Sequence, residues 1–524
     1  MEQVYKLIDS VEIVSFDIFD TLILRPFVQP QDVFVYLENY FNKLGFSKER
    51  LIAERKAKIL ALAKNKKEDC SIDEIYRQIK PEYKDLKNYE INFEKQIATL
   101  NKEMFEVYQY ALKQNKKIIF SSDMYLDKNT IEEILNNNKI LKYEDILISS
   151  ELGISKAGKS LYKYIVSKYN VNPAKILHIG DNEVADIENA KEQSLITYQY
   201  IPPIIQFFNQ SQNTRLKNFY KNNKENSVIS FLIGMQVLNS KNNENYWFNL
   251  GYNVGAILAI SLTLNAIKIA KEKNLTDLYF ISRDAFFPKE IFDTLNNDKN
   301  IKSHYVILNR VLKHKYKNSP KGSNNELYRY LTSIKTNGNK IGIVDTSAGT
   351  FSAQELLQDY LQDKQFLGIY LHTRKNEIYD YINLSNITLD EVKKMFNLNF
   401  IEILLTSLEP KIEDIKDFKP VYETDENKYE VEKRNYYKSI LAGERAFVKM
   451  FSKLFKDFYI NVDVNLIYQY LSNFWNNLTD EDKKYLASIK NSVDTQQTMY
   501  VSLINDKQDI AAQLRQRLQQ KLIH

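Results

Sequence analysis

The chain has 524 residues, 44% of them hydrophobic and 27% charged, which is the composition of a globular protein with two or more domains. Its 72 basic and 67 acidic residues leave a net charge of +5, too small over this length to indicate nucleic-acid binding. Cys70 is the single cysteine, so a disulfide framework and a cysteine-based zinc site are both excluded.

The first expected element is a buried strand at residues 12–16, an apolar run with β-branched residues. It ends at Asp17, and an aspartate at the carboxyl end of a strand lies where open parallel sheets bind their ligands. Asp17 could therefore attack phosphorus as a carboxylate nucleophile. It could equally be the N-cap of a following helix, for which aspartate is a favoured residue.

A helical insert follows this strand. Pro26 and Pro30 end the regular structure, and from residue 31 onward the apolar residues recur with helical spacing. The insert occupies about residues 27–112, between two strands. We expect it to be able to close over a site as a lid.

Three more strands are expected at residues 117–120, 145–150 and 175–179, each followed by a helical segment. This alternation predicts an α/β fold with a doubly wound parallel sheet. Polar residues stand at or just beyond the carboxyl ends of these strands: Ser121, Lys156, Asp181 and Asp186.

Together with Asp17, these side chains form a chemically coherent set. A carboxylate that attacks a phosphate meets charge repulsion, which a Mg²⁺ ion bound by Asp17, Asp181 and Asp186 would neutralise. The Ser121 hydroxyl would hold a phosphoryl oxygen, and Lys156 would bind the same anion and stabilise charge during transfer. The prediction requires one shared cation. Oxygens too far apart, or a basic side chain between the carboxylates, would exclude it.

These stretches resemble the four motifs of the haloacid dehalogenase superfamily. Residues 16–21 are similar to the first motif, with Asp17 in the position of the nucleophile. Residues 120–123 are similar to the second motif, Lys156 to the third, and residues 180–186 to the fourth. The motifs occur in the order and on the elements that the superfamily uses.

The resemblance covers about residues 10–200 and implies a haloacid dehalogenase-like domain over residues 1–205. In such a domain the helical insert at about 27–112 is the cap over the active site, and Mg²⁺ is the cofactor. The resemblance further implies a small phosphorylated substrate, with Ser122 as an additional substrate-binding residue.

One position departs from the phosphatases of this superfamily. They usually carry a general acid two residues after the nucleophile, where this chain has Phe19. Asp20 could supply the proton only if the turn directs it inward, and Asp123 is a second candidate acid. Both could instead be N-caps or hydrogen-bonding supports. General-acid help is typically worth about 10²–10⁴ in rate, so its loss predicts a slow enzyme or a binding protein.

A new domain is expected over residues 227–524, after an Asn-, Lys- and Gln-rich linker at 206–226. Its apolar segment 254–270 contains Asn265 and Lys268, so we expect a core helix and no transmembrane segment. The pattern predicts a second parallel α/β sheet with strands at residues 278–281, 304–308, 341–344 and 366–371.

The rest of the domain, from about residue 389, is expected to be mostly helical and to end in a solvated helix at 509–523. No signal pattern opens the chain, and we expect a cytoplasmic protein, with association at a membrane surface as the alternative.

The second domain also has a candidate binding site. The turn at 346–350, with Thr346 and Ser347, could hold an anion on its backbone N–H groups, assisted by Arg283 and Arg310. These residues could equally be helix caps with incidental charges. The spacing of a P-loop or a dinucleotide fingerprint is missing.

Residues 25–27, 280–284 and 344–345 also resemble predicted hydrolases of the same superfamily that occur with bacterial capsule and lipopolysaccharide genes. This resemblance implies a surface-glycan context, with glycan-synthesis proteins as possible partners. The favoured hypothesis is an Mg²⁺-dependent phosphatase or phosphotransferase that acts on a phosphorylated sugar or glycan precursor. Two alternatives stay open: a slow or inactive binding and assembly protein, and a transferase whose main site surrounds Arg283, Asp284 and Asp345.

Overall fold

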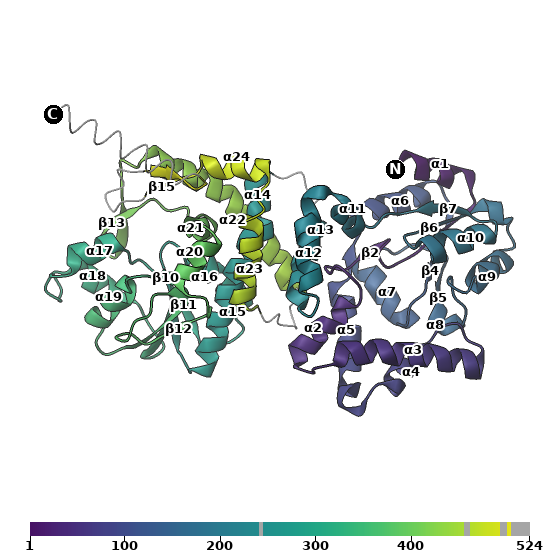
Figure 1. The fold of residues 1–524 in the computed structure, drawn as a ribbon, viewed down its shortest axis with the longest axis horizontal. Helices are drawn as coiled ribbons and strands as arrows, with labels where there is room; N and C mark the ends of the chain where they lie inside the picture. The colour runs from purple at the N-terminus through teal and green to yellow at the C-terminus, as the bar shows by residue number, and fades with distance from the viewer. Residues whose placement is uncertain (240–244, 455–461, 493–499, 505–524) are drawn as a thin grey trace. The chain divides into compact units, whose positions relative to one another are not determined.

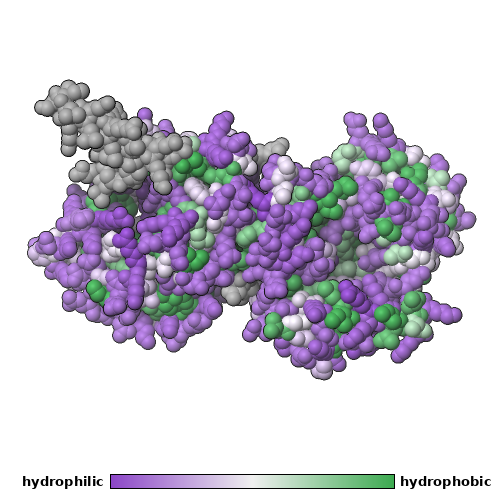
Figure 2. Space-filling model, in the orientation of Figure 1, coloured by the Kyte–Doolittle hydropathy of each residue, from purple (hydrophilic) through white to green (hydrophobic). Residues whose placement is uncertain are grey.

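The computed structural model describes residues 1–239, 245–454, 462–492 and 500–504. The chain forms two compact units, here called the first and the second unit (Figure 1). Of the described residues, the first unit comprises 1–239 and Leu454, and the second comprises 245–453, 462–492 and 500–504. Hydrophilic residues cover most of the visible face of each unit, and apolar residues appear there as small scattered patches (Figure 2).

The first unit is built on a five-stranded parallel sheet with the strand order β5-β4-β1-β6-β7. The strands are β1 (Ile13–Phe16), β4 (Lys117–Ser122), β5 (Asp145–Ile148), β6 (Ile176–Gly180) and β7 (Ile196–Gln199). The chain runs outward from β1 through β4 to β5 and then returns to β6 on the other side of β1. The strand order therefore reverses between β1 and β6, and the predicted doubly wound sheet is confirmed.

Helices cover this sheet on both faces, as the alternation of strands and helices predicts. On one face the buried side chains of Ile13 and Ile119 pack with Leu161 and Ile165. The helical segments outside the insert are α1 (Glu2–Ser10), α6 (Lys102–Lys113), α7 (Lys128–Asn137), α8 (Ser149–Leu152), α9 (Ser160–Tyr169), η2 (Pro173–Lys175), η3 (Glu183–Glu188) and α10 (Asn189–Glu192).

The helical insert is present, and a small antiparallel pair closes its base, β2 (Ile23–Leu24) with β3 (Thr99–Leu100). In Figure 1 its helices lie below the sheet. The insert is shorter than the expected 27–112, because α6 contacts α1 and β4 and so belongs to the sheet's own layer. Its helices are α2 (Asp32–Phe41), α3 (Phe46–Asn65), α4 (Ile72–Gln78), η1 (Pro81–Leu86) and α5 (Lys87–Ile97).

The expected linker at 206–226 is largely helical. It contains most of α11 (Pro203–Asn209), then η4 (Ser211–Asn213) and α12 (Thr214–Asn222). The next helix, α13 (Ser227–Asn239), also belongs to the first unit, because Ser230 Oγ accepts a 2.8 Å hydrogen bond from the Val28 backbone. The described part of the first unit therefore continues through α13 to Asn239, beyond residue 227. The polar composition of α12 reflects an exposed helix face.

The second unit has another five-stranded parallel sheet, in the order β12-β11-β10-β8-β9. Four of its strands match predicted ones, and β12 was not expected. The strands are β8 (Asp277–Ile281), β9 (Lys302–Val306), β10 (Lys340–Ala348), β11 (Gln365–Thr373) and β12 (Tyr381–Asn383). Here the strand order reverses between β8 and β10.

A long apolar helical run, 246–272, is long and apolar enough to cross a membrane, but 78% of its most apolar window is buried. It comprises α14 (Tyr246–Leu250), η5 (Gly251–Gly255) and α15 (Ala256–Glu272), and α15 packs on α16 and α23 of the same unit. The structure thus places the predicted core helix inside the second unit.

The other helices of the second unit are α16 (Phe286–Leu295), α17 (Arg310–Tyr316), α18 (Glu326–Ser333), α19 (Ser352–Tyr360), α20 (Leu389–Met395), α21 (Asn399–Leu404), α22 (Lys428–Leu454), α23 (Val464–Trp475) and α24 (Asp480–Ser488). Two antiparallel pairs interrupt the helical region, β13 (Ile412–Lys416) with β14 (Lys419–Tyr422) and β15 (Lys490–Ser492) with β16 (Tyr500–Ser502). The helix expected at 509–523 lies outside the described residues.

Candidate active site

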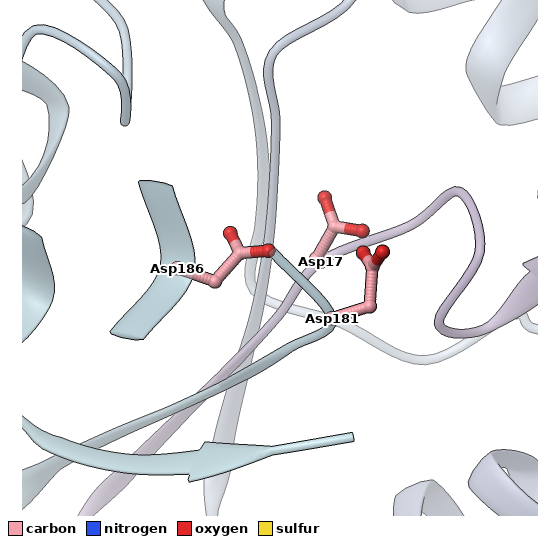
Figure 3. A group of neighbouring side chains, drawn as sticks. All are labelled: Asp17, Asp181 and Asp186. Atoms are coloured by element: carbon pink, nitrogen blue, oxygen red, sulfur yellow. The ribbon is translucent and has the colours of Figure 1, made fainter. Parts of the chain in front are cut away.

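Three carboxylates meet where the strand order of the first sheet reverses. Asp17 follows β1, Asp181 follows β6, and Asp186 lies in η3. One oxygen of each lies within 4.8 Å of the others. Figure 3 shows the carboxylates of Asp17 and Asp181 turned towards the same space, with one oxygen of Asp186 pointing to it. The structure thus brings together the three residues that the sequence predicts as metal ligands.

The ammonium of Lys156 lies against two of these carboxylates. It donates hydrogen bonds of 2.6 Å to Oδ1 of Asp17 and 2.6 Å to Oδ1 of Asp186. Burial lowers the pKa of Lys156, but the two carboxylates outweigh burial and hold that pKa well above its usual value. Lys156 is therefore a fixed positive charge beside the predicted nucleophile.

Lys156 bears directly on the metal prediction, which a basic side chain between the carboxylates would exclude. Lys156 lies between Asp17 and Asp186 and pairs with both, so the excluding condition applies to these two carboxylates. Asp181 forms no ion pair among the described residues. Burial raises the pKa of Asp181 to about 7, and the charges of Asp20 and Asp186 add to this effect. Burial also raises the pKa of Asp17. Burial thus opposes the ionised forms of Asp17 and Asp181, and a divalent cation with these carboxylates as oxygen ligands would stabilise them.

A chain of buried hydrogen bonds runs from Asp186 across the sheet. Nε2 of His178 lies 3.1 Å from Oδ1 of Asp186, and Nδ1 lies 2.9 Å from Oγ of Ser15. Burial lowers the pKa of His178, whereas Lys156 and His178 hold the pKa of Asp186 low against its own burial. Because ionised Asp186 only accepts, neutral His178 donates to it and accepts the proton of Ser15.

This direction of donation affects Ser121. Its Oγ lies 3.0 Å from Oγ of Ser15, which already donates to His178, so Ser121 donates its proton to Ser15. Ser121 would have to leave Ser15 to donate to a phosphoryl oxygen, and its predicted role stays a prediction. Ser122, the last residue of β4, is buried.

Two further carboxylates hold the loop that carries Lys156. Asp123 accepts hydrogen bonds from the backbone N–H groups of Lys156, at 2.8 Å, and Ala157, at 3.0 Å. Glu68, from the helical insert, accepts from the backbone N–H of Ser155 at 2.8 Å and from its hydroxyl at 3.0 Å. Asp123 is thus engaged as a support for the loop. The insert is attached to the same loop through Glu68.

Asp20 stands in the turn after β1 with a left-handed backbone, φ 60°. This conformation sets the direction of its side chain, which lines a cavity together with Asp181. Nη1 of Arg25 lies 3.9 Å from Oδ2 of Asp20, and the Arg25 guanidinium stacks over the Phe19 ring, 4.2 Å from its centre. Burial raises the pKa of Asp20 against the opposing charge of Arg25. Asp20 therefore meets the condition of facing inward, with a pKa shifted in the direction that suits an acid.

The cavity beside Asp20 and Asp181 has a volume of about 450 Å³. Its walls come from the chain after β2 and from the helices α11 to α13. Most of the lining is apolar, and three lysines with helical spacing add positive charge. The apolar residues include Phe27, Pro30, Ile204, Phe208, Val237 and Leu238, and the lysines are Lys217, Lys221 and Lys224.

The structure separates the predicted binding residues of the second unit. Arg283 and Arg310 line a cavity of about 400 Å³ at the carboxyl ends of the strands, together with Asp284 and Asp345. Figure 1 labels β10 and β11, two strands of this sheet.

Thr346 and Ser347 do not line that cavity. The expected turn at 346–350 begins later, because β10 continues to Ala348. The Thr346 hydroxyl donates a 2.8 Å hydrogen bond to Oδ2 of Asp284, and Ser347 is exposed. The anion-binding turn expected at Thr346 and Ser347 is therefore not formed there.

Sequence reasoning missed the side chains that support the site. Ser15 lies in β1, two residues before Asp17 at the end of that strand, so strand alternation places both on one face, and this signal could have identified it. Asn189 donates a 3.1 Å hydrogen bond to the Lys156 carbonyl, and Glu68 comes from the insert. No spacing in the sequence connects Glu68 or Asn189 with Lys156.

The model of the haloacid dehalogenase-like hydrolases matches residues 11–192, and no curated protein matches the chain. Among solved structures, L-2-haloacid dehalogenase from Xanthobacter autotrophicus is 13% identical, over 42% of this chain and 86% of its own, with a TM-score of 0.30. A HAD family enzyme from Bacteroides thetaiotaomicron, in complex with magnesium and inorganic phosphate, is 12% identical over 37% and 95% of the two chains, with a TM-score of 0.29.

The HAD-hydrolase YfnB from Bacillus subtilis, bound to magnesium, is 16% identical over 36% of this chain and 87% of its own, with a TM-score of 0.28. At such TM-scores these structural likenesses carry no argument about chemistry. The family match does cover β1, the insert, β4 and β6, and with them all the carboxylates of the site. It thus supports a haloacid dehalogenase-like hydrolase domain over residues 11–192 of this chain.

Proposed function

We propose that the first unit hydrolyses a phosphoric ester, or transfers its phosphoryl group, through an aspartyl-phosphate at Asp17. The observation that carries this proposal is the arrangement of Asp17, with Lys156 on one side at 2.6 Å and the unpaired carboxylate of Asp181 on the other. Such a site offers a nucleophile, a fixed positive charge and oxygen ligands for a cation within one small space.

The reaction has two steps. The Asp17 carboxylate attacks phosphorus, the bond from phosphorus to the leaving oxygen breaks, and the leaving alkoxide takes a proton from Asp20. Deprotonated Asp20 then removes a proton from water, which attacks the aspartyl-phosphate and releases inorganic phosphate while Asp17 is regenerated. In transfer, another hydroxyl replaces water. Lys156 holds charge in both steps.

Asp17 and Asp181 would hold a Mg²⁺ ion directly, and the ion would supply charge neutralisation for the attack of one anion on another. Both oxygens of Asp186 are already bonded, Oδ1 by Lys156 and His178 and Oδ2 by the Asn182 backbone at 3.0 Å. We therefore assign Asp186 chiefly to holding Lys156 in place.

Mg²⁺ should raise the melting temperature of the wild-type chain, because an ion that binds only the folded state stabilises it by mass action. At a hundred times the dissociation constant the gain is about 2.7 kcal/mol. Asp181→Asn should remove most of this Mg²⁺-dependent increase, as measured by differential scanning calorimetry with and without EDTA. Asp145→Asn, at the edge strand β5, is the matched control. An unchanged increase in the Asp181 variant would contradict the metal assignment.

The cavity lined by Asp20 and Asp181 is the proposed chamber for the leaving group. Its apolar walls and three lysines favour a substrate whose body is partly apolar and carries a second negative charge. A phosphorylated sugar or glycan precursor in bacterial surface-polysaccharide synthesis, handled in the cytoplasm, is the proposed biological context. That context rests on the sequence resemblance alone.

Leu238→Trp should fill part of this chamber and change substrate preference. We expect activity on esters with large leaving groups to fall at least about tenfold, while hydrolysis of acetyl phosphate, a small substrate, stays within about twofold. Phosphate release from matched substrates measures both. Leu152→Trp, at another half-exposed site in the first unit, controls for the added ring. Equal losses on both substrates would contradict a leaving-group chamber.

The second candidate is a binding protein that turns over slowly or not at all. Phe19 favours it, because the usual general acid is missing at that position. A panel of phosphoric esters assayed with Mg²⁺ decides between the candidates. Phosphate release from none of them would favour the binding protein.

A further inference from the structure

The second unit contains a cavity of about 400 Å³ that lies outside the family match. Its sheet reverses strand order between β8 and β10, and open α/β sheets bind ligands outside the carboxyl ends of strands at such a reversal. Asp284 follows β8, Arg310 follows β9, and Asp345 lies in the last part of β10. All three line the cavity.

Two carboxylates, Asp284 and Asp345, line this cavity. Among the described residues neither Asp284 nor Asp345 forms an ion pair; each instead uses one oxygen on Thr346, through its hydroxyl at 2.8 Å and its backbone N–H at 2.7 Å respectively. Burial raises the pKa of Asp284 to about 6, with a further contribution from Glu402, and burial with the charge of Asp284 raises the pKa of Asp345. These groups lack partners that a ligand could supply.

Asn491 is an independent sign of a ligand. It lines the same cavity, is only 2% exposed, and neither atom of its amide has a hydrogen-bond partner within the part of the chain that the structure describes. A buried unpaired amide destabilises a fold, so its presence calls for a partner. An amide that both donates and accepts matches a ligand hydroxyl, which also does both.

The cationic side of the cavity is formed by arginines. Arg283 lies 3.9 Å from Glu430, which also pairs with Lys433 at 3.2 Å, so these two cations share one carboxylate. Arg310 opens α17 and is exposed, with no ion pair among the described residues, and His314 follows one helical turn later. A guanidinium of this kind is suited to bidentate binding of a phosphate group.

We propose that this cavity is a second ligand site, which binds a phosphorylated polyhydroxy compound. The phosphate lies on Arg310 and Arg283, and the hydroxyls lie on Asp284, Asp345 and Asn491. A zwitterion such as an amino acid would also pair with arginine and aspartate. Its ammonium only donates, however, so it could bind the Asn491 amide oxygen but not the Asn491 NH2 group. The site is separate from Asp17 and does not depend on phosphoryl transfer there.

Calorimetric titration of the full-length Asp17→Asn variant in EDTA tests the proposal without turnover. The probes are glucose 1-phosphate, ribose 5-phosphate and glycerol 3-phosphate, with inorganic phosphate and glycine for comparison. We expect at least one phosphorylated polyol to bind more tightly than either comparison compound, and Arg310→Gln to weaken that binding at least about tenfold. Lys317→Gln, exposed just after the same helix, is the matched control.

Binding by none of the three polyols, tighter binding of glycine, or unchanged affinity in the Arg310 variant would overturn the proposal. Asn491→Leu adds a measurement that a purely structural role would not pass. We expect it to weaken polyol binding at least about tenfold while the melting temperature stays equal or rises, because an unpaired buried amide is removed. A lower melting temperature with unchanged binding would show that Asn491 only supports the fold.

Discussion

Asp17→Asn should lower phosphate release by at least about 10⁴-fold, because an amide of the same shape has no negative charge with which to attack phosphorus. The substitution should not destabilise the first unit. It removes one of three crowded carboxylates, and Lys156 keeps its 2.6 Å hydrogen bond to Asp186. Loss of activity with an equal or higher melting temperature is expected of an active site in which repulsion between carboxylates destabilises the folded state.

Asp345→Asn in the second unit is the control for this experiment, since burial also raises the pKa of this carboxylate, which lies in the last part of β10. We expect it to leave phosphate release within about twofold. Mass spectrometry of an acid-quenched reaction should find one phosphoryl group on the peptide that contains Asp17. If Asp345→Asn abolishes activity and Asp17→Asn does not, the main site is in the second unit and the transferase hypothesis replaces the one proposed here.

The sequence predicted those parts of the fold in which a buried apolar run meets a polar residue. The strand before Asp17 and the strand before Asp181 are both short, fully buried runs, and their ends could be placed without a structure. Parallel strands bring their carboxyl ends to one edge, so the meeting of Asp17 with Asp181 followed from the alternation of elements.

The predictions that failed depend on information that local sequence patterns do not contain. The segment at 206–226 has the composition of a linker, but tertiary packing makes it helical, since the Tyr220 hydroxyl donates a 2.9 Å hydrogen bond to Asp32 of the insert. The turn expected at Thr346 lies inside β10 because pairing with β11 extends that strand to Ala348. Both errors come from contacts between residues far apart in the chain.

The residues that hold the Lys156 loop could not be predicted from local sequence patterns either. Its loop is fixed by Glu68, whose carboxylate lies so close to Gly158 that a Cβ there would meet it at 2.2 Å. Glu68 is 88 residues before Lys156, and nothing in either stretch connects them. The direction of Asp20 was also beyond pattern reasoning, because strand alternation does not apply to a residue with a left-handed backbone.

Asp20→Asn should separate substrates by the basicity of their leaving groups. Alkyl phosphates release a strongly basic alkoxide that needs a proton, so their turnover should fall by about 10²–10⁴-fold. p-Nitrophenyl phosphate releases a weakly basic phenolate, and its cleavage should fall by less than about tenfold. Steady-state phosphate release with both substrates under the same Mg²⁺ concentration measures the difference. Asp85→Asn, exposed in the insert, is the matched control.

The contacts of Arg25 indicate that Asp20→Asn should change little besides the carboxyl group. Arg25 donates a 2.8 Å hydrogen bond to Glu94 and stacks on Phe19, whereas its distance to Asp20 is 3.9 Å. Loss of the Asp20 charge therefore leaves Arg25 anchored, and little structural change is expected. Equal losses for both substrates would assign Asp20 to positioning alone. No loss for either substrate would mean that the proton comes from elsewhere, and that the missing acid at Phe19 has no replacement in this turn.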